Sequence, residues 1–356
     1  MRVLHVVESY GAGTASAVGQ YVLATPDLEH HLIRRLRDDD DHADDGELAR
    51  FASVTEMNPG VLSAVRSVRS CVKSLQPDVV HAHSSFGGAF ARLAVRKRAT
   101  RGRGALLVHT PHCYATERQD LGGPARRGYA LAERLLGLNT DVVAACSGRE
   151  AHLGARFAPR ARHVVVPNVT EVTPGSQSRQ PQQGPPVITA MGRLTAQRDP
   201  GVFRDLVGLL ATRVEQPVRA RWIGGGDPAL VDALTRVGIE VTGWLPRSTA
   251  LDLLSTSALY VHTARWDGAP MTMIEAHALG LPQVALLSPA IADAPAECLG
   301  ADAEALADRV ADLVADETRA KTNLTLWDGY FADCTPARQR VALQEAYGRN
   351  DEGRTS

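Results

Sequence analysis

Short apolar runs alternate with amphipathic segments along most of the chain. Residues 3–7, 106–110 and 187–191 are short, mostly apolar runs, which are typical of buried parallel strands. Residues 61–75 place apolar side chains every three to four positions, which is the spacing of an amphipathic helix. This alternation predicts α/β domains that are built on parallel sheets.

The same two patterns recur through the rest of the sequence. Further strands are predicted at residues 31–36, 77–83, 141–146, 164–166, 218–223, 239–241 and 258–263. Further helices are predicted near residues 14–23, 86–98, 127–136, 201–213, 229–237 and 249–255, with a helical tail at about 325–350. In open parallel sheets, ligands bind at the carboxyl ends of the strands. The loops that follow the strands are therefore the candidate binding sites.

Residues 171–186 interrupt the alternation. Their sequence, EVTPGSQSRQPQQGPP, is dominated by Pro, Gln, Ser and Gly and has no apolar period, which is typical of an interdomain linker. A chain of 356 residues also exceeds what one hydrophobic core usually holds. We therefore expect an N-terminal domain at residues 1–170 and a C-terminal domain at residues 187–324.

Composition narrows the class of protein. The chain has 44% hydrophobic residues, 22% charged residues and a net charge of −1, which is ordinary for a soluble globular protein that does not bind nucleic acid. Its five scattered cysteines show no metal-binding spacing with histidine and fit a reducing cytoplasm. The acidic run at residues 38–47 is expected to be a surface loop rather than a metal site. No signal peptide or membrane span is expected.

Positive charge is concentrated in the N-terminal half. Residues 1–168 hold 22 Lys and Arg against 17 Asp and Glu, whereas the remainder holds 17 against 23. The basic residues considered as a cluster are Arg92, Arg96, Lys97, Arg98, Arg101, Arg103, Arg126 and Arg127. Such a cluster either docks an anionic membrane surface or a polyprenyl-diphosphate carrier, or merely decorates solvent-facing helices.

Residues 257–285 combine the features of an anion site. They predict a strand, a glycine-containing loop at 264–270 and a helix that ends at Gly280. The first backbone N–H groups of a helix lack intrahelical partners and attract anions. Glu275 lies about one turn inside this helix, and its carboxylate leans back toward the N-terminus, where it can accept hydrogen bonds from hydroxyls. Phosphate on the amides and ribose on the acid would make a nucleotide site.

Two further loops follow predicted strands of the C-terminal half. The first contains Gly192 and Arg193, with Arg198 shortly after, and the second is the glycine run at residues 224–226. Two guanidinium groups suit a clamp on a diphosphate, because each can form paired, charge-assisted hydrogen bonds with phosphate oxygens. The three loops together predict a nucleoside-diphosphate site in the C-terminal domain.

An ordered set of motifs carries a family resemblance over nearly the whole chain. The motifs are VLHVVESYGAGTAS, PDVVHAHSSFGGAFARLAVR, VHTPHCYATERQD, VVPN, MGRLTAQRDP, WIGGGD, VTGWLP and residues 257–285. In this order they resemble retaining glycosyltransferase family 4. The resemblance implies the GT-B fold, with two facing Rossmann-like domains, an interdomain cleft and a C-terminal helix at about 325–350 that packs back on the first domain. It also implies a donor sugar on the C-terminal domain, an acceptor on the N-terminal domain, and no metal cofactor.

The resemblance also assigns the catalytic positions. Arg193 fills a phosphate-binding position, and Arg198 stands where the family usually has Lys. The family's Glu-x7-Glu pair falls on Asp267 and Glu275, which implies that Asp267 approaches the donor sugar and Glu275 binds the ribose. His112 matches the histidine of the THG-type motif and would contact the transferred sugar, with Cys113 in place of the usual glycine.

The remaining predicted site residues surround these. By the resemblance, Gly11 and Gly13 form a glycine loop that faces the diphosphate and the acceptor. Trp244 either flanks the base or is buried between the domains. On the acceptor side, Glu8 is either a base or a loop acid. His81 and His83 either both point toward the mouth of the cleft, or one of them is a core histidine. The further donor-binding residues are Gly224, Gly268, Ala269, Pro270 and Met271.

The function expected from the resemblance is retaining transfer of a hexose from a nucleoside-diphosphate sugar, with UDP as the expected nucleotide. The expected acceptor is a cell-envelope polysaccharide or a polyprenyl-linked glycan, handled in the cytoplasm or at the inner face of the membrane. The alternatives are a small-molecule or natural-product acceptor, and a non-catalytic protein that binds nucleotide sugars. A dinucleotide-dependent oxidoreductase is a further alternative, which rests only on the Gly11-x-Gly13 pattern after the first strand.

Overall fold

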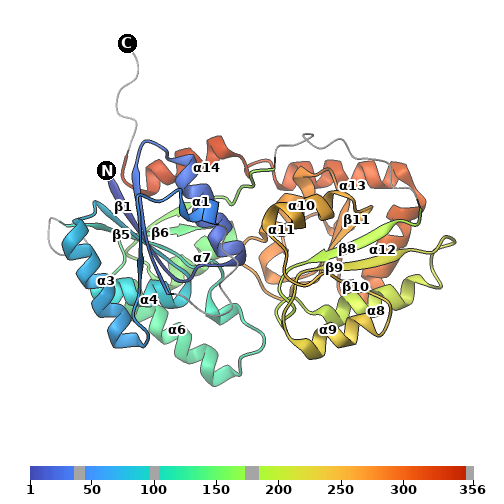
Figure 1. Cartoon of the computed structure of the whole chain (residues 1–356), viewed down its shortest axis with the longest axis horizontal. Coiled ribbons are helices and arrows are strands. Elements are labelled where there is room, and N and C mark those ends of the chain that lie inside the picture. Colours follow the sequence, from blue (N-terminus) through green and yellow to red (C-terminus); the bar gives the residue numbers. More distant parts are fainter. Residues whose placement is uncertain (36–44, 97–103, 173–183, 350–356) are drawn as a thin grey trace, which may run out of the picture. The chain divides into compact units, whose positions relative to one another are not determined.

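The computed structural model describes residues 1–35, 45–96, 104–172 and 184–349. The chain divides into two compact units. Unit 1 contains residues 1–169 and 334–356, and unit 2 contains residues 170–333. Each unit is a layered α/β structure (Figure 1). Most of the linker predicted at residues 171–186, part of the acidic run and the basic residues 97–103 lie outside the described residues.

Unit 1 is built on a sheet of seven parallel strands in the order β3-β2-β1-β4-β5-β6-β7. The strands are β1 (Arg2–Ser9), β2 (Glu29–Arg35), β3 (Ser53–Glu56), β4 (Val79–His83), β5 (Leu106–Thr110), β6 (Val142–Ala145) and β7 (Arg162–Val165). Every residue of β4 and β6 is buried. This explains why β6 reads as a continuous apolar run rather than as an alternating pattern, whereas β4 buries two histidines, His81 and His83.

Helices cover both faces of this sheet. They are α1 (Ala12–Ala24), α2 (Asp45–Leu48), α3 (Val61–Leu75), α4 (Ser84–Ala94), the short 3-10 helix η2 (Ala115–Glu117), α6 (Gly123–Gly137), α7 (Gly148–Phe157) and α14 (Pro336–Ala346). Tyr21 of α1 and Leu343 of α14 pack with Val3, Val79 and Val108 on one face. Helices α3, α4 and α7 pack on the opposite face (Figure 1).

Two glycines let α4 lie directly on the sheet. A Cβ on Gly87 would lie 2.7 Å from the carbonyl oxygen of Val6, and one on Gly88 would lie 2.4 Å from the ring of His109. Real Cβ atoms do not come this close to a backbone oxygen or a packed ring, so only glycine fits at these positions. The FGGAF segment is therefore explained by close packing of α4 on the sheet.

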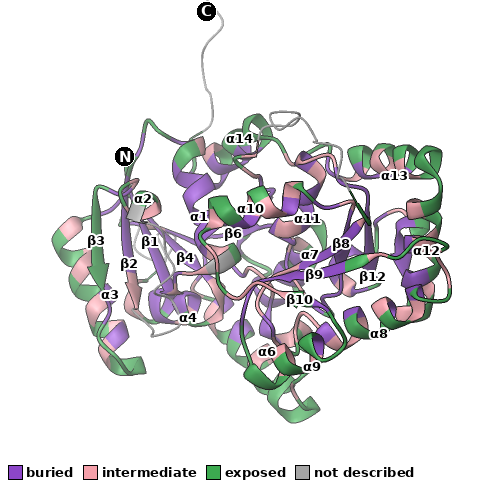
Figure 2. Ribbon diagram, turned by 45° about the vertical axis from the view of Figure 1, so that its right-hand side comes forward, coloured by how far each residue is buried: buried purple, intermediate pink, exposed green. Residues whose placement is uncertain are grey.

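Unit 2 is built on a second parallel sheet of six strands in the order β10-β9-β8-β11-β12-β13. The strands are β8 (Val187–Met191), β9 (Arg219–Ile223), β10 (Glu240–Val241), β11 (Leu259–His262), β12 (Gln283–Leu286) and β13 (Leu299–Gly300). The helices are α8 (Pro200–Leu210), α9 (Pro228–Thr235), α10 (Arg247–Ser255), α11 (Met271–Ala278), η3 (Pro289–Ile291), η4 (Ala296–Cys298), α12 (Ala303–Ala315) and α13 (Glu317–Tyr330). In both units the central strands are buried, the edge strands β3 and β10 are not, and the outer helices expose one side (Figure 2).

The core of unit 2 joins its helices to the sheet. Phe203 of α8 lies edge-on to Trp222 of β9, with ring centroids 5.7 Å apart. Trp222 is buried and donates its indole N–H to the carbonyl oxygen of Gly192, at 2.8 Å. This bond satisfies the polar atom of a buried tryptophan, and it fixes the loop that follows β8.

The C-terminal tail differs from the expected helix at residues 325–350. It contains two helices, α13 and α14, and residues 331–335 separate them. Helix α13 belongs to unit 2, whereas the chain belongs to unit 1 from Cys334 onward. Thr335 caps α14 by accepting a hydrogen bond from the Arg338 amide, and Pro336 occupies the first turn. This cap and proline begin a new helix, which explains the break.

A membrane-spanning helix is not found in the parts of the chain that the structure describes, because none of their helices is both long and apolar enough to cross a bilayer.

Candidate active site

Glycine loops at the carboxyl ends of β8 and β9 are in direct backbone contact. Gly192, Gly224 and Gly226 all have positive φ, which favours glycine. A Cβ on Gly224 would lie 2.3 Å from the carbonyl oxygen of Gly192, and one on Gly226 would lie 2.3 Å from that of Leu194. The two loops therefore form one surface, and Gly224 and Gly226 leave no room for a Cβ at their contact.

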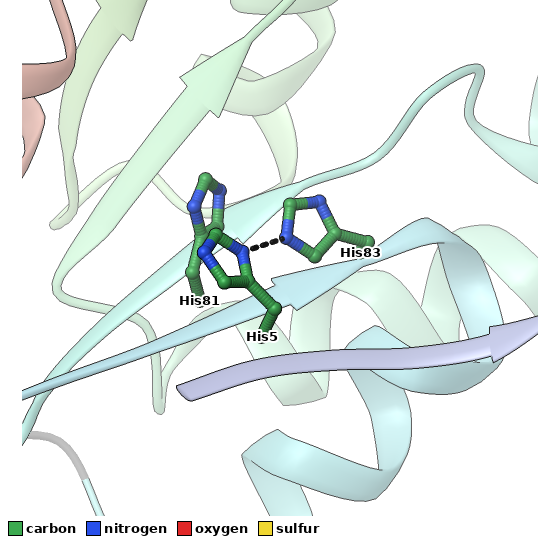
Figure 3. Close-up of side chains that lie close together, drawn as sticks. All are labelled: His5, His81 and His83. Carbon is green, nitrogen blue, oxygen red and sulfur yellow. Dashed lines mark hydrogen bonds between the residues drawn. The ribbon is translucent and has the colours of Figure 1, made fainter. Parts of the chain in front are cut away.

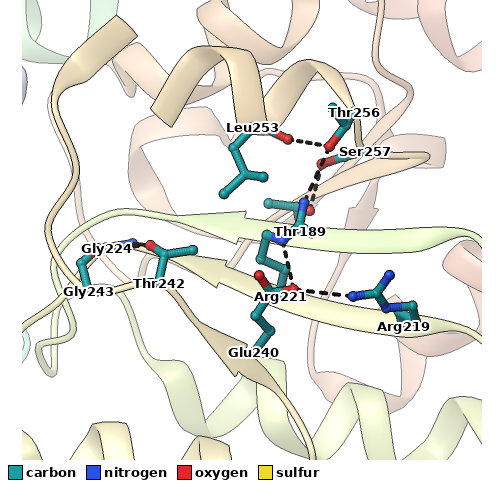
Figure 4. A network of polar contacts seen from close by, with 10 residues as sticks. All are labelled: Thr189, Arg219, Arg221, Gly224, Glu240, Thr242, Gly243, Leu253, Thr256 and Ser257. Atoms are coloured by element: carbon teal, nitrogen blue, oxygen red, sulfur yellow. Dashed lines mark hydrogen bonds and ion pairs between the residues drawn. The ribbon is translucent and has the colours of Figure 1, made fainter. Parts of the chain in front are cut away.

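A polar network fixes the second loop to its neighbours (Figure 4). The Gly224 amide donates to the hydroxyl of Thr242 at 3.1 Å, and that hydroxyl donates to the carbonyl oxygen of Gly243 at 2.8 Å. In the middle of β9, Arg221 donates to the carboxylate of Glu240 at 3.1 Å. These bonds hold the short strand β10 and its loop against β9, so the backbone of the glycine loops is held in place.

Arg193 and Trp244 lie together beside this surface. The guanidinium carbon of Arg193 is 5.7 Å from the centre of a Trp244 ring, which is within the range of a cation–π contact. A Cβ on Gly225 would lie only 3.0 Å from the indole nitrogen of Trp244, so glycine makes room for this side chain. Trp244 keeps 42% of its surface exposed. It therefore offers a flat apolar face next to a fixed positive charge.

Arg198 is held by Asp267. One of its terminal nitrogens lies 2.7 Å from a carboxylate oxygen of Asp267, and the other oxygen of Asp267 accepts from the Gly268 amide at 2.8 Å. The side chain of Arg198 also lies over Gly192, where a Cβ would come within 3.1 Å of its Nε atom. The structure thus brings the predicted residues Gly192, Arg198, Asp267 and Gly268 into one connected group.

Glu275 lies within α11 and is 1% exposed. Its Oε1 atom accepts from Arg247 at 2.6 Å, whereas its buried Oε2 atom has no hydrogen-bond partner among the described residues. Burial raises the pKa of Glu275, and the charges of Arg247 and Arg198 oppose that rise. A buried oxygen without a partner is costly, and a ligand hydroxyl would satisfy it.

The first turn of α11 adds backbone groups to this site. Pro270 caps the helix, Gly268, Pro270 and Met271 are buried, and Ala269 is half-buried. Tyr260 of β11 donates its hydroxyl to Thr272 at 2.7 Å, which ties the strand to the helix. The helix N-terminus thus lies directly after Asp267 and Gly268, as the sequence predicted for an anion site.

His112 lies on a strained loop after β5 in unit 1. Both His112 and Cys113 have positive φ, at 48° and 86°. The loop is held by Glu150 of α7, which is 3% exposed. Its two carboxylate oxygens accept from the backbone amides of Cys113 and Cys146, at 2.7 and 2.8 Å. One buried carboxylate therefore joins the loop after β5 to the loop after β6.

Comparison with known protein families decides the class. Residues 6–169 match the family described as "Glycosyl transferase 4-like domain", and residues 185–316 match the family described as "Glycosyl transferases group 1". The chain belongs to glycosyltransferase family 4. The resemblance seen in the sequence is thereby confirmed, and the two matches fall on unit 1 and unit 2 of this glycosyltransferase.

Curated relatives are distant and partial. The protein described as "UDP-Gal:alpha-D-GlcNAc-diphosphoundecaprenol alpha-1,3-galactosyltransferase" from Escherichia coli is 24% identical over 273 residues, which cover 68% of this chain and 67% of that protein. EpsF of Bacillus subtilis (strain 168) is 24% identical over 255 residues, which cover 67% of this chain and 64% of that protein. The chain thus aligns with about two thirds of the length of each.

Solved structures share the fold. Anabaena Alr3699/HepE in complex with UDP and glucose matches with a TM-score of 0.71 and 16% identity, covering 97% of this chain and 99% of that one. The lipopolysaccharide outer core galactosyltransferase WaaB, in its apo form, matches with a TM-score of 0.63 and 16% identity over the same shares. The glycosyltransferase has the GT-B fold, as the sequence predicted.

Cys113 stands where the family has glycine, and its backbone has the conformation that glycine prefers. We expect Cys113→Gly to stabilise the enzyme by about 0.5–1 kcal/mol, because relief of the positive φ exceeds the entropy that glycine adds to the unfolded chain. Urea denaturation followed by circular dichroism would measure the change. Cys113→Ala is the matched control, since it removes the thiol but keeps the Cβ and the strain. A gain equal to that of the glycine variant would show that φ is not the cause.

The other residues predicted in unit 1 have clear positions. Gly11 caps the N-terminus of α1, and Gly13 is exposed in its first turn. Glu8 is 6% exposed and lies 3.6 Å from Arg35 in an ion pair. His83 is fully buried, with its Nδ1 atom 3.1 Å from Nε2 of His112. His83 therefore lies behind His112, away from the surface.

Arg92 was wrongly included in the basic surface cluster. It is 4% exposed and forms a paired contact with the buried carboxylate of Glu133, at 2.8 and 3.1 Å. It also donates to the carbonyl oxygen of Gly88 at 2.9 Å. Its role is structural, whereas Arg126 and Arg127 are exposed on α6.

Arg247 and Glu150 were missed by sequence reasoning. Arg247 opens α10 and reaches Glu275 across 28 positions of the chain, and Glu150 reaches Cys113 across 37. Neither stands in a motif that predicts such a contact. Only the fold brings each charged group to its partner.

Proposed function

We propose that this glycosyltransferase moves a hexose from UDP-hexose to a sugar carried on a lipid diphosphate, with retention of the anomeric configuration and without a metal ion. The observation that carries the proposal is the buried, unpartnered oxygen of Glu275 beside the N-terminus of α11. An acid that accepts from ribose hydroxyls, next to helix amides that bind phosphate, suits a nucleoside diphosphate. Relatives that act on UDP-galactose or bind UDP and glucose support UDP as the nucleotide.

Arginines would stabilise the leaving diphosphate in the proposed reaction. The acceptor oxygen forms a bond to the anomeric carbon on the face from which the diphosphate departs. The bond from that carbon to the phosphate oxygen breaks, and the acceptor proton passes to the leaving phosphate, which gives the glycoside and UDP. Arg193 and Arg198 offset the negative charge that grows on the phosphate, and a fixed charge costs no reorganisation at that moment.

Metal independence is supported by the way the acids are paired. Asp267 contacts Arg198, and Glu275 contacts Arg247. A divalent cation would have to compete with these guanidinium groups for the carboxylate oxygens. The arginines and the helix N-terminus are proposed to supply the positive charge that a metal ion supplies in other transferases.

An open cavity of about 580 Å³ in unit 1 supports the lipid-diphosphate acceptor. Its wall includes Thr116 and Glu117 of η2, which follows the His112 loop closely in the chain. The remaining lining residues that matter here are Arg126, Arg127, Arg134, Arg156, Leu131, Leu153 and Phe157. Four positive charges beside apolar side chains suit a diphosphate that is attached to a hydrocarbon chain. The same face would bring the enzyme to an anionic membrane surface.

Release of UDP tests the proposal. A panel of UDP-hexoses is mixed with GlcNAc-diphosphate-lipid or with the same sugar lacking the lipid diphosphate. We expect rapid release only with the lipid-linked acceptor, and an α-glycoside as the product by NMR. Arg126→Glu with Arg127→Glu should raise the acceptor KM, whereas Arg66→Glu, an exposed arginine on α3, should not.

Other outcomes would favour the alternatives. Equal turnover with the soluble sugar would favour a small-molecule acceptor. Binding of UDP without any turnover would favour a non-catalytic binding protein. Tight binding of NAD without binding of UDP would favour an oxidoreductase. A β-glycoside product from an α-linked donor would contradict retention.

A further inference from the structure

Four histidines form a continuous hydrogen-bonded chain across the sheet of unit 1. His30 lies on β2, His5 on β1, His83 on β4, and His112 just after β5. His30 Nδ1 is 3.0 Å from His5 Nε2, His5 Nδ1 is 3.0 Å from His83 Nε2, and His83 Nδ1 is 3.1 Å from His112 Nε2. Figure 3 shows the central link, between His5 and His83. The histidine chain thus runs from β2 to the loop at the carboxyl end of β5.

At His30, the inner end of the histidine chain, the direction of the hydrogen bond is fixed. Nε2 of His30 lies 3.1 Å from the backbone carbonyl oxygen of Thr25. A carbonyl oxygen can only accept a hydrogen bond, so Nε2 of His30 must carry a hydrogen. The hydroxyl of Thr25 lies equally close but donates to the carbonyl oxygen of Tyr21, so it too accepts from His30.

Burial keeps the interior rings neutral. Loss of solvation lowers the pKa of His5 and His83 well below the usual value, and it also lowers the pKa of His30. Neighbouring histidines lower the pKa of each ring further, whereas the Thr25 carbonyl and Asp27 oppose the fall at His30. A neutral imidazole has one N–H and one acceptor nitrogen. Fixing the hydrogen on one nitrogen therefore fixes the role of the other.

We infer that the Thr25 carbonyl sets the tautomer of His112 through this chain. His30 carries its hydrogen on Nε2, so its Nδ1 accepts from Nε2–H of His5. His5 Nδ1 then accepts from Nε2–H of His83, and His83 Nδ1 accepts from Nε2–H of His112. All four rings have the same tautomer, with Nδ1 of His112 as its acceptor atom. His30, His5 and His83 are positioning residues that act through His112.

His81 lies beside the chain and is satisfied separately. The hydroxyl of Tyr347 donates to its Nδ1 atom at 2.9 Å. Its Nε2–H donates to the hydroxyl of Thr110 at 2.8 Å, because that hydroxyl donates in turn to the carbonyl oxygen of Ala144. One nitrogen from each of His5, His81 and His83 lies within 4.8 Å of the others. Every ring nitrogen of these three histidines has a hydrogen-bond partner, which favours a hydrogen-bond network over a metal site.

The fixed tautomer has a consequence for recognition, which rests on the proposed function. His112 directs its only hydrogen inward, so its Nδ1 atom can only accept a hydrogen bond. A sugar hydroxyl that donates its hydrogen would be preferred at this position, and an oxygen that can only accept would be rejected. The histidine chain thus determines whether His112 selects a hydrogen-bond donor or an acceptor on the sugar.

Nitrogen-15 NMR of the full-length enzyme, labelled at histidine, tests the inference without any substrate. At neutral pH we expect His5, His30, His83 and His112 all to show the neutral form with hydrogen on Nε2. Detection of the Nδ1–H form or of an imidazolium at any of the four histidines would overturn the inference. Added Zn²⁺ should leave the four signals unchanged, and stoichiometric displacement of the His5 and His83 signals would establish a metal site instead.

His30→Phe tests transmission along the chain. It removes the acceptor for Nε2–H of His5, so His5, His83 and His112 are expected to move toward the Nδ1–H form, although His112 is three rings away. His31→Phe is the matched control, because His31 is a buried neighbour on β2 that bonds Ser53 and not the chain. An unchanged tautomer at His112 in a folded His30→Phe protein would overturn the inference. If that variant does not fold, His5→Phe should change the tautomer of His83 and leave that of His30.

Activity gives a separate readout. With the tautomer changed, we expect kcat for transfer to fall about tenfold, the effect of one hydrogen bond lost at the sugar. The affinity for UDP should be unchanged in His30→Phe, because UDP is proposed to bind to unit 2. Absence of any transfer in the wild-type enzyme would count against the proposed function but would leave the NMR result to decide on the histidine chain.

Discussion

Replacing Arg193 by alanine is expected to lower kcat/KM for sugar transfer about 100- to 1,000-fold, the effect typical of removing one group that stabilises transition-state charge. Its guanidinium lies beside the glycine surface and against Trp244, so the charge is held where the diphosphate is proposed to leave. The side chain is half-buried in a surface loop. The fold should therefore survive its loss, and steady-state assays on the folded variant would measure the effect.

Two comparisons make this prediction specific. Arg204→Ala removes an exposed arginine of unit 2 that pairs with Asp205, and it should leave the rate unchanged. Glu275→Gln keeps the shape of the side chain but removes its charge, so it should raise the KM for the UDP-sugar more than it lowers kcat. An Arg193→Ala enzyme that turns over within twofold of the wild type would refute the assignment of Arg193 to the leaving group.

Replacing Glu133 by alanine is expected to destabilise unit 1 by about 3–5 kcal/mol, as is typical when one partner of a buried ion pair is removed. Arg92 and Glu133 are 4% and 5% exposed. Without the carboxylate, the guanidinium stays buried beneath α6 with an uncompensated charge. Urea denaturation of the wild type and the variant, followed by circular dichroism, would measure the loss.

A surface pair in the same unit provides the control. Arg118 and Asp120 also form a close ion pair, at 2.6 Å, but their side chains are 44% and 33% exposed. Asp120→Ala should cost less than about 1 kcal/mol, because solvent screens exposed charges. The double variant Arg92→Met with Glu133→Leu should recover much of the stability, since it leaves no buried charge. A loss below 1 kcal/mol for Glu133→Ala alone would contradict this account.

The regular part of the fold could be predicted because burial leaves a simple pattern. The bounds predicted for β5, β8 and α3 agree with the structure. Strands covered on both faces are almost wholly apolar, and α3 shows its buried side at helical spacing. These signals are local, so a single sequence is enough to detect them.

Several missed elements lack such a local signal, whereas α12 was missed although its buried Leu306, Ala307 and Val310 recur at helical spacing. All four residues of β3 (Ser53–Glu56) are exposed, so this edge strand has no apolar face to detect. Helix α7 buries Glu150 together with Leu153 and Phe157, and a buried acid hides the apolar side of the helix. Strands β12 and β13 contain only four and two residues. Such short elements exist because neighbouring strands pair with them, and that information is not local.

The candidate site shows the same division between local and long-range information. The glycines, Arg193 and Glu275 stand in motifs that can be recognised in one stretch of sequence. Arg247, by contrast, meets Glu275 only after the sheet has formed, and the link from Thr25 to His112 needs three strands in register. Single residues of the site were therefore predictable, whereas the partners that orient them were not.

The contact between the Gly192 and Gly224 loops makes the backbone there independent of the side chains that surround it. Where Gly224 approaches Gly192, the contact is made by peptide groups, and a side chain on Gly224 would collide with the Gly192 backbone. We therefore expect substitutions at the surrounding side chains, such as Trp244 or Asp267, to leave in place the backbone that is proposed to hold the phosphates. Such an arrangement lets donor preference diverge among related enzymes, or be changed in the laboratory, while the frame for phosphate binding stays the same.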